Sequence, residues 1–262
     1  MAERTEKETA FLRDLYVDVE WTSKFTEILD ESLEFGDEKE VLYLNAGSGG
    51  HAIEVSSKLS ESTSLTAVCE SAELASIAKH KSEALKSRAV FVHEKPRRRF
   101  DAVIADGTFI HAEDTLEMLA DASTFLDAGG RLVAMTVSAS SFGEIHSMLW
   151  EALERAGVGE GLVEKLISSV PTVSAMEAMI QGQGLSDVTS MTKAVSFEFE
   201  DGKALIESPM MEHFFLPRWL GGLSDGDVTR VKGLLAEIID EEFVGMTFRF
   251  GIKATALTGI QK

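Results

Sequence analysis

Short apolar runs alternate with amphipathic stretches over residues 8–156. The runs have the length and composition of buried strands, and the stretches between them place apolar residues at helical spacing. The expected strands cover residues 41–44, 65–69, 89–92, 100–105 and 129–135. The expected helices cover residues 8–35, 53–59, 71–87, 113–126 and 142–156. Strands and helices that alternate at this spacing predict a parallel sheet with right-handed crossovers.

The pattern changes after about residue 157. The expected elements are a helix over 173–182, a strand over 185–200, helices over 203–220 and 225–242, and a strand over 246–256. The closing strand alternates apolar and polar residues, which is typical of a half-buried strand. The two late strands therefore predict an antiparallel pair separated by helices.

Composition places the chain among ordinary globular proteins. Its 262 residues are 44% apolar and 26% charged, and the length is compatible with one α/β domain. The net charge of −19 would repel a phosphate backbone, so nucleic acid is a poor partner. The cationic run Arg97–Arg99 is interpreted as a solvated loop; the alternative is a binding site for a phosphate or an acidic ligand. The single cysteine, Cys69, excludes a disulfide within the chain and a cysteine-rich metal site.

The first residues are charged and do not have the apolar core of a secretory signal. No apolar run approaches the roughly 18 residues that a membrane span needs. We therefore expect a cytoplasmic protein without a membrane span.

The segment Asn45-Ala-Gly-Ser-Gly-Gly50 carries the strongest chemical signal, because it connects an expected strand to an expected helix. Glycines let the backbone turn sharply and approach a ligand, and the helix N-terminus presents unpaired N–H groups. Glu70 ends the next strand, about 20 residues on, where a carboxylate accepts hydrogen bonds from ribose hydroxyls. This order predicts a nucleoside-containing ligand; the alternative is a structural turn with a solvated Glu70.

The loop alone does not identify the nucleoside, because residues 47–52 also fit the dinucleotide pattern G-x-G-x-x-A. Both tyrosines lie at or before the loop, so a downstream Tyr-x-x-x-Lys pair for hydride transfer is absent. This disfavours an NAD-linked oxidoreductase. Ser48 is one residue out of frame for a G-x-S-x-G nucleophile elbow, and no two histidines have the i,i+4 spacing of a helical zinc pair.

Four segments resemble motifs of class I S-adenosylmethionine-dependent methyltransferases. They are Val41–Gly50, Leu65–Glu70, Phe100–Gly107 and Leu126–Val133. The resemblance covers about residues 40–150, and the C-terminal part is similar to small-molecule methyltransferases of the quinone-biosynthesis type. It implies a doubly wound, seven-stranded, mostly parallel α/β sheet with an antiparallel last strand and a helical insertion near the C-terminus.

The resemblance also implies a domain organisation and an activity. We expect a single domain over residues 1–262, with a helical segment over 1–40, a cofactor-binding core over 41–156 and a C-terminal part over 157–262. Helices near 203–242 would form a lid. The implied reaction transfers a methyl group from S-adenosylmethionine to a small apolar or aromatic molecule and leaves S-adenosylhomocysteine. The expected partner is this acceptor, and a homodimer is possible.

By position, the resemblance assigns the loop to the methionine part of the cofactor, Glu70 to the ribose, and His93 and Glu94 to the adenine. The complete set of implied cofactor residues is Asn45, Ala46, Gly47, Ser48, Gly49, Glu70, Ser71, His93, Glu94, Ala105, Asp106 and Gly107. The expected substrate residues are Tyr16, Trp21, Phe109, Met211 and Phe215. No metal is expected. The chemistry needs alignment more than a catalytic group, and His111 is the candidate base.

Two residues depart from the family pattern. Asn45 stands where the family usually has an acidic residue, and His51 replaces a frequent glycine. Loss of the acidic charge leaves open a degenerate, non-catalytic binding module with the same fold. The enzyme interpretation also requires that no side chains fill the bend at residues 45–50 and that Glu70 faces it.

Overall fold

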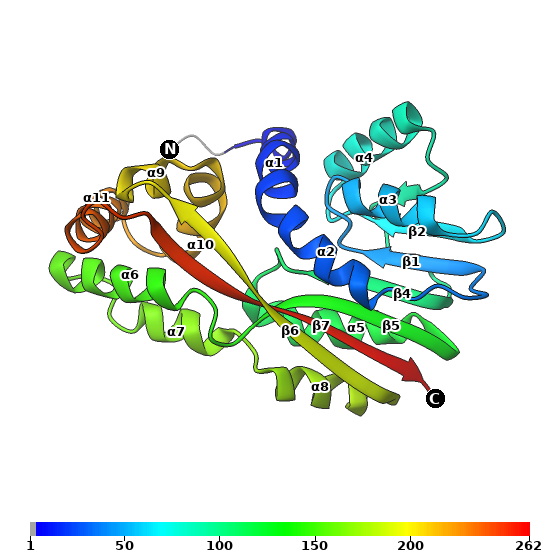
Figure 1. Ribbon diagram of the computed structural model, residues 1–262. Coiled ribbons are helices and arrows are strands. Elements are labelled where there is room, and N and C mark those ends of the chain that lie inside the picture. Colours follow the sequence, from blue (N-terminus) through cyan, green and yellow to red (C-terminus); the bar gives the residue numbers. More distant parts are fainter. Residues whose placement is uncertain (1–3) are drawn as a thin grey trace. The chain divides into compact units, whose positions relative to one another are not determined.

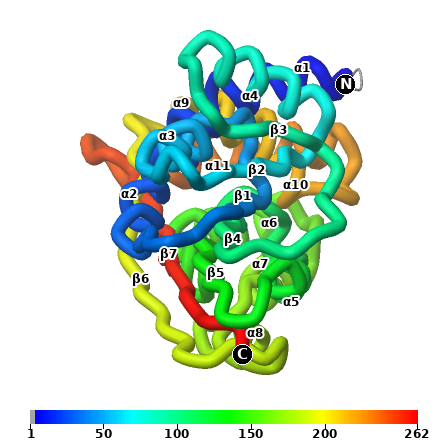
Figure 2. The backbone as a smooth tube through the Cα atoms, turned by 90° about the vertical axis from the view of Figure 1, so that its right-hand side faces the viewer, coloured from blue at the N-terminus to red at the C-terminus, as the bar shows by residue number. Residues whose placement is uncertain are grey.

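A computed structural model describes residues 4–262, and within them seven strands form one sheet in the order β3-β2-β1-β4-β5-β7-β6 (Figure 1). Strands β1 to β5 pair in parallel, and their order along the sheet can be followed in Figure 2. Strand β7 runs antiparallel to β5, since Thr136 bonds to the carbonyl of Thr255 and Ser138 to that of Lys253. The predicted fold is confirmed. The strands are β1 (Glu40–Leu44), β2 (Ser64–Val68), β3 (Val90–Val92), β4 (Phe100–Gly107), β5 (Leu126–Ser138), β6 (Leu185–Phe199) and β7 (Phe248–Gln261).

The helices follow the predicted order, but the helix predicted over 203–220 is divided into α9, η3 and α10, and two further differences occur. The helices are α1 (Glu6–Leu12), η1 (Arg13–Thr22), α2 (Ser23–Ser32), α3 (Gly50–Lys58), α4 (Ala72–Leu85), η2 (Ala112–Asp114), α5 (Thr115–Thr124), α6 (Gly143–Ala156), α7 (Leu162–Ser169), α8 (Val173–Gly182), α9 (Gly202–Glu207), η3 (Met211–Phe215), α10 (Leu216–Trp219) and α11 (Asp225–Glu242). The single helix predicted over 8–35 is instead three consecutive pieces, of which η1 is a π-helix. Helix α7 was not predicted, because the glycines that precede it are typical of a loop.

The chain packs as two compact units. The first comprises Met1–Val137, Pro171–Lys193 and Ala254–Lys262, and the second comprises Ser138–Val170 and Ala194–Lys253. Residues 1–3 lie outside the described part of the chain. The helices between β6 and β7 lie in the second unit, as the predicted insertion requires. The single domain predicted over 1–262 stays a prediction, since compact packing does not report independent folding.

The first unit has a sheet that is covered on both faces. Leu42 and Leu44 point to one face of β1, where they belong to a buried apolar cluster with Leu119 of α5 and Met176 of α8. Tyr43 points to the other face, where it meets the first turn of α3. Because side chains alternate along a strand, one short apolar run supplies both faces of the doubly wound sheet.

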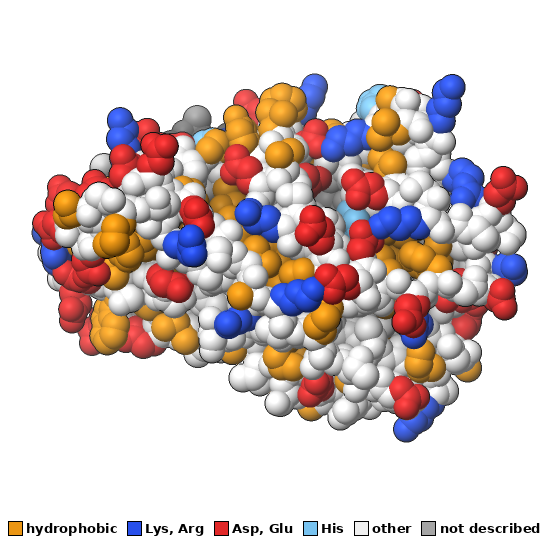
Figure 3. Space-filling model, in the orientation of Figure 1, with side chains coloured by type: hydrophobic (Ala, Val, Ile, Leu, Met, Phe, Trp, Pro, Cys, Tyr) orange, Lys and Arg blue, Asp and Glu red, His pale blue; other side chains and the backbone are white. Residues whose placement is uncertain are grey.

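The second unit is built on aromatic packing. Phe142 lies against Phe215, Trp219 and Phe250, with ring centroids 5.3–5.9 Å apart. His146 of α6 is buried in the same cluster, 5.4 Å from the Trp219 ring. The outer surface of this unit is acidic, and Asp and Glu side chains are dense over α11 in Figure 3.

Candidate cofactor site

The loop between β1 and α3 is a tight bend with three alternating residues in the left-handed conformation. The φ angles are +57° at Asn45, +55° at Gly47 and +87° at Gly49. Left-handed φ favours glycine, and asparagine is among the few other residues that adopt it readily. Asn45 therefore takes the conformation of a glycine in the loop.

The Asn45 side chain connects two strand ends. Its amide nitrogen donates to the carbonyl oxygen of Asp106 at 3.0 Å, so it joins the end of β1 to the end of β4. An aspartate at this position would place carboxylate oxygens against that carbonyl and lose the donor. The geometry thus explains why an amide suits position 45, which the sequence alone presented as a lost acidic residue.

Glu70 faces the loop, as the nucleoside interpretation requires. It follows β2, and its Oε2 accepts the Gly47 N–H at 3.0 Å. The side chain is 25% exposed. Ser71, the next residue, caps α4 by accepting the N–H of Leu74. The acidic residue and the loop backbone therefore lie within hydrogen-bond distance of each other.

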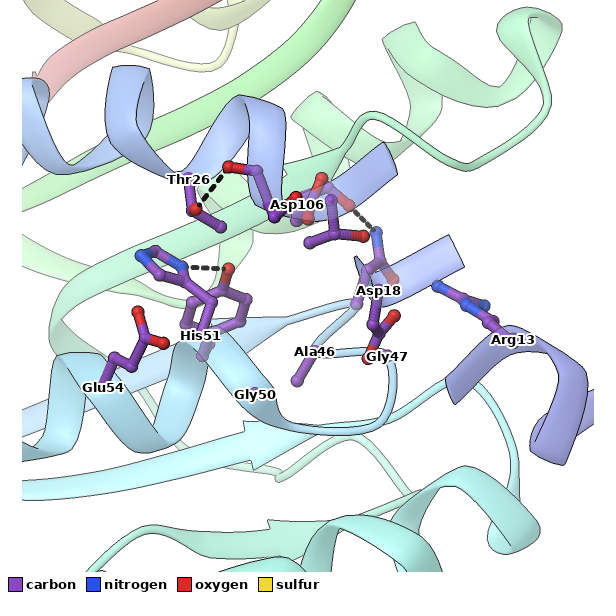
Figure 4. A pocket seen from close by; sticks show the side chains of 13 residues that line it. Arg13, Asp18, Thr26, Ala46, Gly47, Gly50, His51, Glu54 and Asp106 are labelled. Atoms are coloured by element: carbon purple, nitrogen blue, oxygen red, sulfur yellow. Dashed lines mark hydrogen bonds between the residues drawn. The ribbon is translucent and has the colours of Figure 1, made fainter. Parts of the chain in front are cut away.

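The bend itself is occupied by side chains of η1, so the structure does not meet the requirement that no side chains fill residues 45–50. Arg13 forms an ion pair with Oε1 of Glu70. The backbone N–H of Ser48 donates to Oδ2 of Asp18 at 3.2 Å, and the Ser48 hydroxyl bonds to the same carboxylate. Figure 4 shows Arg13 and Asp18 beside the loop of Ala46 and Gly47. No sequence pattern indicates these contacts, since they join residues 30 or more positions apart.

A second ion pair adds to this cluster. Lys81 of α4 pairs with Asp14 and also donates to the Ser48 hydroxyl at 2.7 Å. Burial raises the pKa of Asp18, which opposes the lowering effect of the Ser48 hydrogen bonds. Desolvation therefore disfavours the charged form of the Asp18 carboxylate in this environment.

A small cavity lies beside the loop. It encloses about 110 Å³ and is lined by Arg13, Asp18, Thr22, Ser23, Thr26, Tyr43, Asn45, Ala46, Gly47, Gly50, His51, Glu54 and Asp106. On its α3 side the Tyr43 hydroxyl lies 2.8 Å from Nδ1 of His51, and Nε2 of His51 lies 3.3 Å from Asp30. Figure 4 shows His51 with a dashed line for a hydrogen bond of its ring. His51, noted only as a replaced glycine in the sequence, thus holds a buried tyrosine hydroxyl.

Comparison with known proteins shows likeness at the level of structure. Neither a protein-family model nor a curated protein sequence matches the chain. The YcgJ protein of Bacillus subtilis aligns with a TM-score of 0.56 at 15% identity, over 92% of this chain and 99% of that one. Geranyl diphosphate C-methyltransferase of Streptomyces coelicolor, solved with S-adenosylhomocysteine, aligns with a TM-score of 0.52 at 13% identity, over 100% of this chain and 86% of that one. The [4+2]-cyclase SpnF aligns with a TM-score of 0.50 at 15% identity, over 90% of this chain and 79% of that one.

These alignments decide the architecture. The chain has the Rossmann-like methyltransferase fold. Within this fold, the ends of β1, β2 and β4 lie side by side, because these strands are neighbours and run in parallel. Ligands of open α/β sheets bind outside the carboxyl ends of the strands. The glycine loop, Glu70 and Asp106 all lie at that edge.

The methyltransferase fold places the remaining predicted cofactor residues in two environments. Ala105, Asp106 and Gly107 end β4, and Oδ1 of Asp106 accepts the N–H and hydroxyl of Thr108. Burial raises the pKa of Asp106, although the Thr108 hydrogen bonds lower it. His93 and Glu94 are exposed just past β3. Their predicted roles stay predictions.

Two predicted substrate residues meet in the first unit. Trp21 and Phe109 have ring centroids 6.3 Å apart, and the Trp21 indole N–H donates to the carbonyl of Thr108. Trp21 is fully buried, Phe109 is also buried and Tyr16 is half-buried. His111 is exposed before the short helix η2. It has no contact with a buried polar group that would mark it as a base.

Met211 and Phe215, the other predicted substrate residues, are buried within the second unit. Phe215 packs against Phe142 and Trp219 there, so it contributes to the core of that unit. The lid role of these residues stays a prediction. Cys69 is buried, and burial raises its pKa to about 12, which favours the protonated thiol over the reactive thiolate.

Two classes of site receive no support from the described part of the chain. No group of three or more His, Cys, Asp or Glu residues within 4–262 is placed to hold a metal ion. Among the same residues, no helix combines the length and apolar character needed to cross a membrane.

Proposed function

We propose that the protein transfers a methyl group from S-adenosylmethionine to a small apolar or aromatic molecule. The observation that supports this most directly is the carboxylate of Glu70, 3.0 Å from a glycine N–H at the carboxyl edge of a methyltransferase-type sheet. A carboxylate there offers acceptors for two ribose hydroxyls. The neighbours' shared fold supports the same reaction class.

The donor set fits an adenosyl cofactor. The Gly47 N–H of the loop donates to Glu70, and Asp106 supplies a second carboxylate near the end of β4. The cofactor supplies the methyl group and the positively charged sulfur that makes it reactive. The residues of this chain would bind and orient it, and exclude water.

Titration calorimetry with S-adenosylhomocysteine tests the proposal. Glu70→Ala should weaken binding about 10- to 100-fold, because hydrogen bonds to a charged group contribute roughly 1.5–3 kcal/mol. Glu61→Ala, which removes an exposed carboxylate from the turn before β2, is the matched control and should bind as the wild type does. No binding at millimolar ligand, either by wild type or by Arg13→Gln and Asp18→Ala variants whose contacts with the loop are removed, would remove the proposal.

A second candidate function is ligand binding without methyl transfer. It is favoured by the occupied bend, and by the likeness of this fold to a protein named as a cyclase. Incubation with S-adenosylmethionine and a panel of apolar hydroxyl- and amine-bearing acceptors separates the two. Formation of S-adenosylhomocysteine with a methylated product supports the enzyme, whereas tight binding without turnover on the whole panel favours the binding module.

A further inference from the structure

Helix η1 (residues 13–22) carries apolar side chains on two faces: Val17 and Trp21 are buried, whereas Leu15 and Val19 are exposed. Its charged residues Arg13, Asp14 and Asp18 point to the glycine loop and its neighbours. The apolar residues that it carries at i,i+4 spacing with Phe11 of α1 point outward. The exposed fractions are 57% at Phe11, 44% at Leu15 and 64% at Val19. Polar contacts to the loop and burial of Val17 and Trp21 together hold this stretch against the site.

The polar contacts occupy the groups that the proposed cofactor needs. Arg13 pairs with one oxygen of Glu70, and the Gly47 N–H takes the other. Asp18 takes the Ser48 N–H. The ribose-binding carboxylate and one loop N–H therefore both have partners supplied by η1.

The cavity beside the loop is also too small to hold a cofactor together with the side chains of η1. The cavity beside the loop encloses about 110 Å³, whereas ligand pockets run from about 300 Å³ upward. A Cβ atom added to Gly47 would lie 3.2 Å from the Asp18 carboxylate and 3.7 Å from the Arg13 guanidinium. These side chains pack directly on the loop backbone, and a ligand that approached the same backbone would have to displace them.

The closed arrangement includes two ion pairs. Each ion pair is largely buried, with side-chain exposures of 16% and 25% for Arg13 and Glu70, and 33% and 20% for Lys81 and Asp14. Desolvation of such pairs offsets most of their mutual attraction. The Nε of Arg13 is buried without a hydrogen-bond partner, which adds a further cost. Displacement of η1 would return these charges to water, and this offsets part of the interaction energy that is lost.

The C-terminal end of η1 is anchored by Trp21. Trp21 is fully buried, bonds to Thr108 and packs on Phe25 with ring centroids 5.0 Å apart. The backbone between Arg13 and Thr22 is a π-helix, a conformation that is rare and concentrated at functional sites. Motion about the Trp21 anchor would lift Arg13, Asp14 and Asp18 together.

We propose that residues 13–22 are an internal latch that occupies the cofactor site and must leave Glu70 and the glycine loop before an adenosyl ligand binds. The proposal rests on the proposed function, because the ligand is the one assigned to that site. The latch lowers apparent affinity by the fraction of molecules that are closed. Contacts that hold it closed therefore oppose binding.

Affinity for S-adenosylhomocysteine gives the first test. Arg13→Gln, which frees the Glu70 carboxylate, should bind at least about threefold more tightly than wild type. Asp18→Ala, which frees the Ser48 N–H, should do the same. Arg155→Gln is the matched control, since it removes an exposed arginine ion pair with Glu151 and Glu241 in the second unit. Circular dichroism of each variant establishes that it is folded.

Hydrogen exchange of the wild-type protein gives the second test. On addition of saturating S-adenosylhomocysteine, amides of residues 45–50 should exchange more slowly and those of residues 13–20 more quickly. Ligands ordinarily protect the segments that they touch, so faster exchange at 13–20 is specific to a displaced latch.

The outcomes separate the latch from the function on which it rests. Tighter binding by both variants together with faster exchange at 13–20 supports the latch. Weaker or unchanged affinity in either folded variant, or slower exchange at 13–20, overturns the latch alone, because the segment would then hold or cover the ligand. Absence of binding by wild type and by both variants overturns the proposed function.

Discussion

Gly49 offers a direct measure of how closely the glycine loop is packed. Its φ of +87° is left-handed, which costs a residue with a Cβ about 1–2 kcal/mol. A Cβ at this position would lie 2.7 Å from the Cβ of Ala78 and 2.8 Å from the ring of Phe91, both of which are buried. Overpacking of this kind costs about 1–3 kcal/mol. Gly49→Ala should therefore lower the free energy of unfolding by about 2–5 kcal/mol.

The neighbouring residue is a control within the same loop. A Cβ on Gly50 would meet no atom within 4 Å, and its φ is not positive. Gly50→Ala should be neutral or stabilise by up to about 1 kcal/mol, because alanine is favoured over glycine in a helix. Urea unfolding followed by circular dichroism measures both variants. Equal stability of Gly49→Ala and Gly50→Ala would refute the close packing of the loop on α4 and β3.

Three further predictions test buried contacts elsewhere. Burial lowers the pKa of His146 to about 4, so between pH 4 and its ordinary pKa near 6.5 the unfolded state binds more protons than the folded state. The free energy of unfolding should therefore fall by about 2 kcal/mol from pH 7 to pH 5. In urea titrations, His146→Leu should lose this contribution to the pH dependence of stability. Tyr43→Phe leaves Nδ1 of the buried His51 without its partner and should cost about 1–3 kcal/mol in the same assay; no change would mean that water satisfies the ring. Gly202→Ala places a Cβ 2.2 Å from a backbone oxygen of α11 and should lower stability by at least about 3 kcal/mol, whereas Gly233→Ala, with open space around it, should stabilise slightly in thermal unfolding.

The sheet could be predicted because each strand has a recognisable local sequence pattern. Runs such as Val41–Leu44 are short and apolar, and the glycine loop that follows β1 fixes where the strand ends. The antiparallel β7 could also be predicted, since its alternation differs from the continuous apolar runs of the parallel strands. Helix α7 was missed because Gly157, Gly159 and Gly161 break the pattern just before it, and all three adopt positive φ.

The position of Glu70 followed from order along the chain, whereas the interpretation of Asn45 did not. Glu70 ends the strand next to β1, so topology alone brings it to the loop. The role of Asn45 depends on its φ and on a bond to the carbonyl of Asp106, a residue 61 positions away. Sequence letters carry neither a backbone angle nor a partner on another strand.

The same reasoning explains why the latch could not be predicted from its own residues. Residues 13–22 are an unremarkable mixture of charged and apolar side chains, and only their tertiary position shows that the charged ones face inward. Arg13 there supplies a positive charge to Glu70, and a cationic sulfonium ligand would bring a positive charge to the same acidic edge, which also carries Asp106. Arg13 thus supplies a counter-charge to Glu70 in the absence of ligand, while Asp14 and Asp18 of the same helix bring further carboxylates to the loop. An acidic edge open to such a cation would otherwise hold two neighbouring carboxylates without a counter-charge, which raises their free energy.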